Sequence, residues 1–308
     1  MKAIGFVLLM GTILFSSCRK QYELATVTVN TVDYITHTSA IAKCNATDDG
    51  GVFIVEKGVC WSEKSPATIL DNYSNRGIQG IGIYESPLFN LKSGTVYYVR
   101  AYAKNLKGIS YSEEKQFETT VPEYLIDSRD NQKYAVVKIG NQYWMAENLN
   151  YYTKDGSWYY NNDSILFSKF GRLYSWYNAC EVCPDGWHLP DKDDWNELFS
   201  YLLNSFTGFD EACEDLNAYK LKLPGTVFWE YEQDSINNET GFSATAAGTY
   251  DNKNNSFYNN MYYAVYWVFD EYDTNNAWFC RLESYSNSIC TNFGDKGSGL
   301  SVRCIKNE

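Results

Sequence analysis

Five short segments in the second half of the chain constrain its fold most strongly. Each combines aromatic or aliphatic residues with glycine, proline or cysteine, so positions suited to a core alternate with positions suited to a turn. In the first segment, apolar residues flank Gly140-Asn141, which predicts two strands, Tyr134 to Ile139 and Gln142 to Met145, joined by a tight turn. The five segments are Val136 to Asn150, Gly171 to Trp176, Cys183 to Pro190, Gly241 to Ala244 and Ser301 to Ile305.

The region after the third segment carries a helical pattern. Apolar residues recur at spacings of three and four from Trp195 to Phe206, which gives one apolar stripe. Asp191 is suited to cap the first turn, because its carboxylate can accept hydrogen bonds from free backbone N–H groups. We therefore expect a helix from Asp191 to about Ser205. A second helix is expected from Glu211 to Leu221.

Taken in order, the five segments resemble the Fibrobacter succinogenes major paralogous domain, which is common in surface proteins of Bacteroidetes-type bacteria. The resemblance implies that residues 134–308 form an α+β domain with a C-type-lectin-type fold and act as a displayed binding module. It implies no particular ligand, because the ligands of most members are unknown. The chain also departs from the family where a Trp-Trp-Ser-Ser-like block is usual, since it reads Tyr266-Trp267-Val268-Phe269-Asp270 there.

Residues 27–120 show a different pattern, that of short strands separated by glycine-rich turns such as Asp48-Asp49-Gly50-Gly51. The segments Lys57 to Ser62, Tyr97 to Ala103 and Gln116 to Thr120 resemble the fibronectin type III-like domains of bacterial surface proteins, which act as spacers as often as binders. The expected fold is a β-rich chain of two domains. A fibronectin III-like β-sandwich over 27–120 is followed by a linker over 121–133 and the lectin-like domain over 134–308.

The first 18 residues have the parts of an export signal. Lys2 precedes an apolar stretch from Ala3 to Phe15, which is too short to span a bilayer stably, and Ser16-Ser17 comes before Cys18. This arrangement resembles a bacterial lipoprotein signal over residues 1–18, in which Cys18 becomes the lipidated first residue, followed by a tether over 19–26. An uncleaved apolar anchor is the alternative. We expect an outer-membrane lipoprotein, facing either the cell surface or the periplasm.

The charge of the chain limits its partners. The formal net charge is -12 and the pI is about 4.7. An acidic chain offers no basic patch that would displace counterions from nucleic acid, and it is not attracted to anionic lipid. The expected partners are therefore a glycan or a surface protein, with membrane contact only through the lipid anchor and no nucleic acid.

The cysteines suggest disulfides. Of the nine cysteines, Cys18 is assigned to the lipid, which leaves an even number in an exported chain. Cys44 and Cys60 flank a predicted hairpin, so they are candidates for one pair. Cys280 and Cys290 flank a predicted turn, so we expect them to pair across two strands.

The resemblance adds a long-range disulfide. In lectin-type folds such a bond ties the region of the first helix to the last strand, which implies a Cys183–Cys304 pair. Cys180 and Cys213 would then be left to each other. Cys180 and Cys183 also form a C-x-x-C pattern, but no second such pattern follows and His37 and His188 are the only histidines, so a zinc site is not expected.

No motif of a catalytic or nucleotide-binding site occurs, and His188 is interpreted as a packed structural residue. The lectin-type fold also serves formylglycine-generating enzymes, to which Leu189-Pro190 and Arg303-Cys304 look similar. Those enzymes use a close pair of reactive cysteines, whereas a cross-strand disulfide is the simpler interpretation of Cys280 and Cys290. The chain is therefore expected not to be an enzyme, and an oxidase of this type is a lesser alternative.

Calcium is left open, and no other metal or cofactor is expected. Carboxylate and amide oxygens are the ligands that calcium prefers. The chain has neither an EF-hand loop nor the Glu-Pro-Asn and Trp-Asn-Asp patterns of sugar-binding C-type lectins. The acidic and asparagine residues that could bind calcium are therefore also interpreted as solvated loop residues. The possible calcium ligands are Asp251, Asn252, Asn254, Asp270, Glu271 and Asp273.

The segment Tyr250 to Asn292 is rich in Tyr, Trp and Asn, which together supply flat stacking surfaces and adaptable hydrogen bonds. We expect an aromatic and asparagine-rich face here to bind a glycan or a protein without catalysis. An alternative function is a structural or accessory subunit of an adhesin-like or fimbria-like surface assembly. An alternative interpretation of the composition is that these rings fill a β-rich core. The proposed contacts are Trp229, Tyr258, Tyr262, Tyr263, Trp267, Tyr272, Trp278 and Tyr285.

Overall fold

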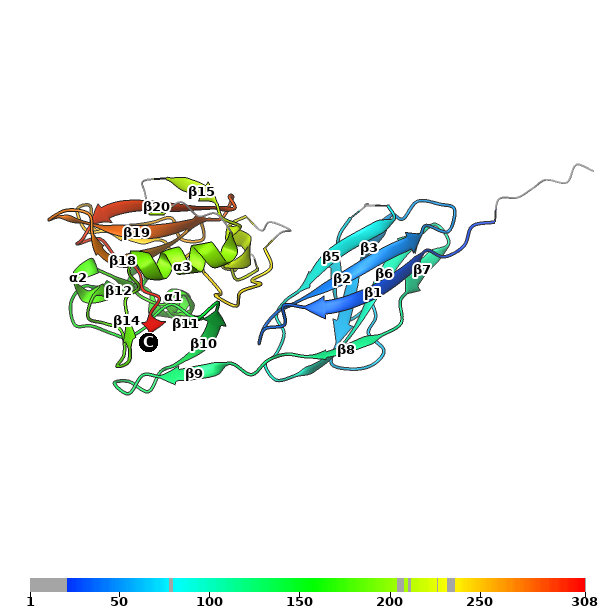
Figure 1. Ribbon diagram of the computed structural model, residues 1–308, viewed down its shortest axis with the longest axis horizontal. Coiled ribbons are helices and arrows are strands. Elements are labelled where there is room, and N and C mark those ends of the chain that lie inside the picture. The colour runs from blue at the N-terminus through cyan, green and yellow to red at the C-terminus, as the bar shows by residue number, and fades with distance from the viewer. Residues whose placement is uncertain are drawn as a thin grey trace, which may run out of the picture.

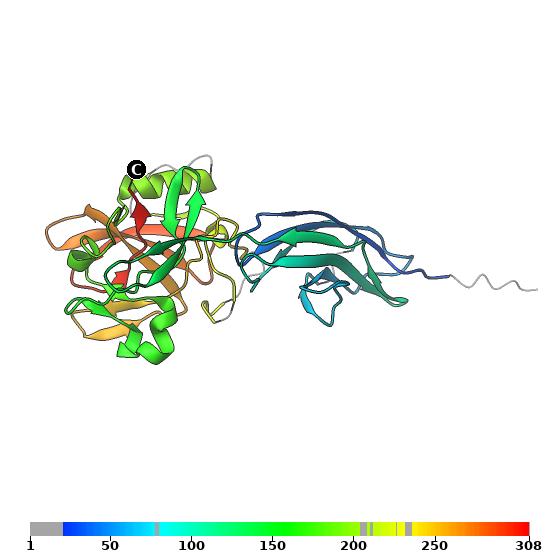
Figure 2. The same ribbon diagram turned by 90° about the horizontal axis from the view of Figure 1, so that it is seen from below.

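The computed structural model describes residues 21–77, 80–203, 208–209, 212–225, 227–231 and 236–307. These residues form two β-rich units that lie end to end in both views (Figures 1 and 2). The expected signal segment with Cys18 lies outside the described residues, as do the two expected helix boundaries at Ser205 and Glu211. Within the described ranges, none of the helices has the length and apolar character needed to cross a bilayer.

The first unit is a sandwich of two antiparallel sheets, as the alternation of its sequence predicts. The first sheet has the order β1-β2-β5, and the second has the order β4-β3-β6-β7 with β8 also paired to β6. Side chains from both sheets meet in one core that includes Val59, Trp61 and Tyr97. The strands are β1 (Thr26–Asp33), β2 (Ala40–Asp48), β3 (Glu56–Ser62), β4 (Asn72–Asn75), β5 (Gly82–Leu88), β6 (Val96–Asn105), β7 (Gly108–Tyr111) and β8 (Lys115–Glu118).

Cys44 and Cys60 do not pair, so this expected disulfide is wrong. Both are free and buried, but they lie in different sheets of the sandwich. Cys44 points into the core between the sheets. Because side chains alternate along a strand, Cys60 points away from the core side chains of Val59 and Trp61, and its Sγ lies 3.5 Å from the Arg100 carbonyl oxygen.

The sandwich begins earlier in the chain than predicted, within the expected tether. The Glu23 backbone N–H donates to the Gly50 carbonyl oxygen at 3.0 Å, and the Asn105 amide donates to the Glu23 carbonyl oxygen at 2.8 Å. Ala25 is only 4% exposed in the core. Residues 23–26 are therefore part of the sandwich, and the predicted tether over 19–26 is too long.

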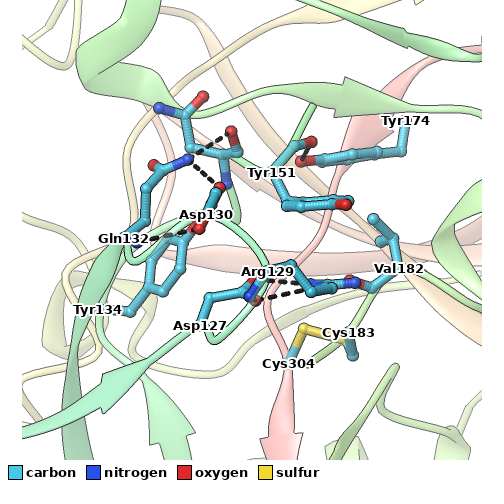
Figure 3. Close-up of polar contacts among 11 residues, drawn as sticks. Asp127, Arg129, Asp130, Gln132, Tyr134, Tyr151, Tyr174, Val182, Cys183 and Cys304 are labelled. Atoms are coloured by element: carbon cyan, nitrogen blue, oxygen red, sulfur yellow. Dashed lines mark hydrogen bonds and ion pairs between the residues drawn. A yellow bond between two sulfur atoms is a disulfide. The ribbon is translucent and has the colours of Figure 1, made fainter. Parts of the chain in front are cut away.

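The expected linker over 121–133 is also too long, because most of it belongs to the second unit. Strand β9 (Glu123–Ile126) pairs with β10 (Lys133–Ile139), which leaves only Val121-Pro122 between the units. The turn after β9 is held by Arg129, whose guanidinium donates two hydrogen bonds to Asp127 and one to the Val182 carbonyl oxygen. Figure 3 shows this contact beside the Cys183–Cys304 disulfide.

The second unit contains two sheets and a hairpin. The smaller sheet has the order β14-β22-β11-β10-β9, and the larger has the order β12-β13-β21-β18-β19-β20-β15. The last strand pairs with β11, so the end of the chain lies beside the beginning of this unit (Figure 1). The remaining strands are β11 (Gln142–Met145), β12 (Ser157–Trp158), β13 (Leu173–Tyr174), β14 (Trp187–His188), β15 (Cys213–Asp215), β16 (Thr249–Asp251), β17 (Ser256–Tyr258), β18 (Tyr263–Glu271), β19 (Asn276–Glu283), β20 (Ser288–Asp295), β21 (Leu300–Ser301) and β22 (Ile305–Lys306).

The predicted first hairpin and first helix are present. Strands β10 and β11 pair around Gly140, which has a φ of 60°. Helix α3 (Lys192–Leu202) is capped by Asp191, and its apolar stripe packs on the larger sheet. The short helices are α1 (Ser164–Phe167), α2 (Trp176–Ala179) and the 3-10 turns η1 (Tyr160–Asn162), η2 (Ser168–Phe170) and η3 (Ala218–Lys220).

The second expected helix, Glu211 to Leu221, is wrong. Among its described residues, Cys213 to Asp215 form strand β15, and only the turn η3 is helical. Asn217 between them has a φ of 56°, a left-handed conformation that interrupts an α-helix. Pairing of β15 with β20 thus replaces local helix formation.

The two disulfides differ in how well the sequence predicted them. Cys183 bonds to Cys304, the pair that the resemblance implied. Cys213 bonds to Cys290, so the expected Cys280–Cys290 and Cys180–Cys213 pairs are wrong. The reason is strand register: Cys290 lies opposite Arg281 in the ladder, so the side chains of Cys280 and Cys290 project from opposite faces of the sheet.

A buried guanidinium lies at the centre of the second unit. Arg303 is 1% exposed and donates to the side-chain oxygen of Asn148 and to the carbonyl oxygens of Met145, Phe242 and Ser243. Its guanidinium also lies 4.5 Å from the centre of the Phe242 ring. Arg303 therefore joins the segment between β21 and β22 to the end of β11 and to a loop that has almost no exposed surface.

We expect the Arg303→Met substitution to destabilise the second unit by about 3–5 kcal/mol, because three carbonyl groups and one amide would lose a buried donor. Denaturant unfolding followed by tryptophan fluorescence measures this change. Of the nine tryptophans only Trp61 precedes residue 121, so the signal reports mainly on the second unit.

The matched control is Lys138→Met, which makes the same cation-to-thioether change on the exposed side of β10. Its effect should stay within about 0.5 kcal/mol. Equal stability of the two variants would contradict the role given to Arg303.

Candidate functional site

The two faces of the larger sheet in the second unit have different surroundings. Residues Ala264, Tyr266 and Val268 of β18 face helix α3 and belong to the core beneath it. Because side chains alternate along a strand, Val265 and Trp267 face the other way. On that face, two cross-strand pairs lie next to each other: Val265 opposite Arg281, and Trp267 opposite Phe279. This second face forms the floor of the site.

A groove of about 310 Å³ lies between this floor and the β16–β17 hairpin, and we call it the hairpin groove. Gly294 on β20 keeps the floor open, since a Cβ there would stand 3.3 Å from the Phe279 ring. The residues that line the groove are Thr249, Tyr250, Asp251, Tyr258, Asn259, Tyr263, Val265, Trp267, Phe279, Arg281, Gly294, Ser298 and Leu300.

The wall of the groove is fixed by packing and by backbone contacts. The ring of Tyr250 packs at a tilt against those of Trp158 and Phe257, with ring centres 4.3 and 4.9 Å apart. Gly248 hydrogen-bonds through its N–H to the Tyr263 carbonyl oxygen at 3.0 Å. A Cβ on Gly248 would lie 2.5 Å from the Tyr258 carbonyl oxygen, so only glycine allows the hairpin to approach this closely. The wall is therefore positioned before any ligand binds.

Polar groups cluster at one end of the groove. The Arg281 guanidinium lies 4.9 Å from the centre of the Tyr263 ring and forms an ion pair with Glu283 at 2.7 Å. The hydroxyl groups of Tyr263 and Tyr285 lie 3.2 Å apart, and this hydrogen bond raises the pKa of Tyr285. This end of the groove thus offers hydroxyl donors and acceptors and a guanidinium beside its aromatic floor.

Four of the predicted tyrosine contacts gather near the groove. Tyr258 and Tyr263 line it, and Tyr285 contacts Tyr263. Tyr262 lies next to this group but packs on Tyr231, with ring centres 6.1 Å apart. Tyr258, Tyr262 and Tyr285 are between 38% and 52% exposed, so their rings are accessible to a ligand.

The three predicted tryptophan contacts are buried, so they are wrong as surface contacts. Trp229 and Trp267 are 0% exposed, and Trp278 is 8% exposed. Trp267 underlies the groove and donates its indole N–H to the Tyr174 carbonyl oxygen, whereas Trp229 and Trp278 belong to the core on the helix side. Large apolar rings contribute most to stability when they leave water, which the composition of the segment does not reveal.

Tyr272 lies away from the groove. Its ring stacks on Phe293 with centres 3.7 Å apart, and Trp278 packs edge-on against it. Phe293 and Trp278 are cross-strand neighbours, so this cluster belongs to the opposite face of the sheet. The predicted contacts therefore divide between two separate places.

The sequence interpretation missed Phe279 and Arg281 as groove residues. The alternation of side chains along β18 and β19 could have identified them. Because Tyr263 faces the groove, Val265 and Trp267 on the same strand also face it. Their cross-strand partners are Arg281 and Phe279, which therefore face it too. Using this signal requires the register of the two strands, which composition does not supply.

The possible calcium ligands make hydrogen bonds within the protein and do not converge. Asp251 accepts from the Asn254 side chain, and this bond lowers the pKa of Asp251. Asp270 accepts from the Lys192 backbone N–H. Within the described residues, no group of three or more His, Cys, Asp or Glu side chains is placed to hold a metal ion.

A lysine occupies the place where oxygens do converge. The Lys296 ammonium lies 2.9 Å from the Asp273 carbonyl oxygen, 3.2 Å from that of Thr274 and 3.1 Å from a Glu271 carboxylate oxygen. Lys296 is 3% exposed, and its ammonium lies 4.7 Å from the centre of the Trp176 ring. This internal cation balances the loop oxygens as a bound metal ion would.

His188 is held in place by two neighbours. Its Nε2 lies 3.0 Å from an Asp194 carboxylate oxygen, and its Nδ1 lies 2.7 Å from the Asn307 side-chain oxygen. The same Asp194 oxygen accepts from the Asp191 backbone N–H at 3.0 Å, which closes the cap of α3. His188 therefore joins the start of the helix to the end of the chain.

The cysteine pair expected of a formylglycine-generating oxidase is not formed. Cys290 is bonded to Cys213, and Cys280 is a buried free thiol whose pKa is raised by burial. A thiol with a raised pKa is less often the reactive thiolate. The geometry around Cys280 and Cys290 thus gives no support to that alternative.

The fold and the site define a two-unit β-rich chain whose second unit carries an aromatic groove. The sequence profile of the Fibrobacter succinogenes major domain matches residues 137–306, more than half of the chain. The chain therefore belongs to this family. No curated protein sequence matches it.

Several solved structures resemble about a third of the chain. The sensor domain of the anti-sigma factor RsgI4 of Pseudobacteroides cellulosolvens is 17% identical, with 32% of this chain and 95% of that chain covered and a TM-score of 0.25. The sixth fibronectin type III domain of human fibronectin type III domain containing protein 3 is 19% identical, with 35% and 94% covered and a TM-score of 0.25.

We expect the melting temperature of the protein to be unchanged by calcium, because the Lys296 ammonium already occupies the oxygen-lined position. A calcium site with a Kd of about 1 mM would add roughly 1.4 kcal/mol at about 10 mM calcium, a shift of several degrees. Thermal unfolding with calcium and with EDTA measures this. A rise of several degrees with calcium would contradict the assignment of Lys296.

Proposed function

We propose that the chain is a non-catalytic binding protein of the cell envelope, and that the hairpin groove of its lectin-like second unit binds a carbohydrate. The observation that carries this proposal is the combination of an aromatic floor with a polar end in one pre-formed groove. The floor is the partly exposed ring of Phe279, with the buried Trp267 beneath the groove, and the polar end is Arg281 with the hydroxyl groups of Tyr263 and Tyr285.

This combination suits the surface of a sugar ring. A pyranose has an apolar face of C–H groups, which packs on an aromatic ring, and a rim of hydroxyl groups, which needs donors and acceptors nearby. Sites for small ligands usually have mostly apolar walls of this kind with a few convergent polar groups. Tyrosine supplies contact area with little loss of side-chain entropy, which favours binding through Tyr258 and Tyr263.

The charges at the groove favour an uncharged sugar. The positive charge of Arg281 is balanced by Glu283 at 2.7 Å, and Asp251 adds an exposed carboxylate at the opposite wall. A ligand with a carboxylate would therefore meet no unbalanced cation among these groups. Neutral hydroxyl groups can instead accept hydrogen bonds from the Arg281 guanidinium and exchange them with the Tyr263 hydroxyl, both of which line the groove.

A second function, as an accessory subunit of a surface assembly, is favoured by one exposed feature. Ile165 and Leu166 are adjacent on α1 and are 90% and 61% exposed. Exposed aliphatic side chains next to each other are typical of a surface that a protein partner covers. This surface differs from the hairpin groove, so the two functions can be tested separately.

The test is a glycan-array screen of the purified protein and of two variants. Tyr258→Ala removes an exposed ring from the groove, and Tyr177→Ala removes a 59% exposed ring from α2 as the matched control. We expect a reproducible hit whose affinity falls at least about ten-fold in Tyr258→Ala, or about 1.4 kcal/mol, and stays unchanged in Tyr177→Ala.

Equal losses in both variants would contradict a site in the groove. A blank array from folded protein would contradict the carbohydrate proposal and favour a protein partner. Capture of envelope proteins that is lost in Leu166→Ser would then support the assembly function.

We further propose that Cys18 carries a lipid anchor in the outer membrane and that the β-sandwich holds the groove away from the bilayer. The proposal rests on the sequence around Cys18, because that segment lies outside the described residues. Metabolic labelling with an alkyne fatty acid should label the wild-type protein, and Cys18→Ser should abolish the label and detach the protein from membranes, since one cysteine carries the chains. A labelled Cys18→Ser protein would contradict the anchor.

A further inference from the structure

A third buried cation contacts the turn near the polar end of the groove. Lys222 is 0% exposed, and its ammonium donates to the Glu283 carbonyl oxygen at 2.5 Å and to the Ser286 carbonyl oxygen at 2.7 Å. It also lies 5.1 Å from the centre of the Trp229 ring. The backbone of Lys222 bridges to Ala244 in the buried loop, so the side chain reaches out from the middle of the unit.

The two carbonyl groups bracket the turn that carries Tyr285. This turn joins β19 to β20, and the Tyr285 hydroxyl lies 3.2 Å from that of Tyr263, which lines the groove. The same turn is held at two other points, where the Ser284 N–H donates to the Tyr262 carbonyl oxygen and the Ala218 N–H donates to the Asn287 carbonyl oxygen. Lys222 is the only one of these donors that carries a charge.

The charge of Lys222 has no carboxylate partner among its hydrogen bonds. Burying an ammonium group costs free energy, and hydrogen bonds to carbonyl oxygens offset part of that cost. Burial lowers the pKa of Lys222 to about 8, against the opposing effect of the nearby Glu283 charge. The ammonium form therefore predominates below about pH 8, and the neutral amine predominates above it.

We propose that Lys222 is a positioning residue of the hairpin groove: it holds the Glu283–Ser286 turn so that Tyr285 stands against Tyr263 at the polar end. The proposal rests on the binding function proposed for the groove, and it adds that the charge on Lys222 controls the position of Tyr285 at that site. The ionisable groups around the turn are Glu283, which faces Lys222, Arg281, which pairs with Glu283, and the two tyrosines. Loss of the charge on Lys222 weakens both bonds to the turn, because a neutral amine is a poorer donor.

The test follows the Tyr285 ring by NMR of the full chain carrying ¹³C-labelled tyrosine, with the signal assigned from Tyr285→Phe. The pKa of Tyr285 is itself raised by its bond to Tyr263, so its phenol stays protonated over the range used, about pH 6 to 9.5. We expect the wild-type ring signal to shift with a midpoint near pH 8. We expect no such midpoint in Lys222→Met.

The matched control is Lys220→Met, which removes a cation two residues away that pairs with Glu239. It should leave the Tyr285 titration unchanged. A wild-type signal that stays flat through pH 8 overturns the proposal, and this result does not depend on whether Lys222→Met folds. A midpoint that persists in folded Lys222→Met also overturns it.

Binding separates this proposal from the function of the groove. For a glycan found on the array, affinity should fall about two- to ten-fold between about pH 7 and 9.5 in the wild type, and it should be low at both values in Lys222→Met. Affinity that is independent of pH would overturn the positioning role while leaving the groove as the binding site. Absence of binding at every pH would overturn the groove function, and the ring titration would still decide the role of Lys222.

Discussion

The hydrogen bonds of Arg303 hold the second unit together. One guanidinium, 1% exposed, donates to groups from the end of β11 and from the loop at Phe242 and Ser243. These segments are far apart in sequence. The neighbouring Cys304 is bonded to Cys183, so the segment between β21 and β22 is also tied to the region just before β14. The loop over residues 242–247 forms no strand, although each of its side chains is at most 8% exposed. Buried backbone without regular pairing needs other partners for its polar groups, and Arg303 supplies two of them.

Two further buried cations bind irregular backbone in this unit. Lys222 donates to the carbonyl groups of the turn after β19, and Lys296 donates to those of the loop after β18. Each cation also lies over an aromatic ring, Trp229 for Lys222 and Trp176 for Lys296. Carbonyl oxygens and ring faces both attract positive charge, so these groups jointly offset the cost of desolvating the ammonium. Most residues that line the hairpin groove lie on strands β16 to β21, so paired backbone pre-forms the site.

The sequence predicted the features that depend on local pattern. The hairpin around Gly140 and the helix capped by Asp191 follow from turn chemistry and from apolar spacing. Features that depend on register or on distant neighbours were missed. Cys290 pairs with Cys213 rather than Cys280 because a shift of one residue moves a side chain to the other face of a sheet. From the composition of their segment, Trp229 and Trp278 were expected to contact a ligand, but they fill the core beneath α3. Strand β9 was expected to be part of the linker, because its partner strand begins seven residues further along the chain.

Hydrogen exchange of the wild-type protein tests most directly the claim that a buried cation organises the unit. Backbone amides exchange slowly when their hydrogen bonds open only with the fold. The amides of Ala244 and Ala246 donate to Leu221 and Phe228, outside any strand. If Arg303 fixes this loop, these amides should exchange as slowly as those of β18 and β19. Exchange at the rate of an ordinary surface loop, with β18 and β19 still protected, would contradict the account.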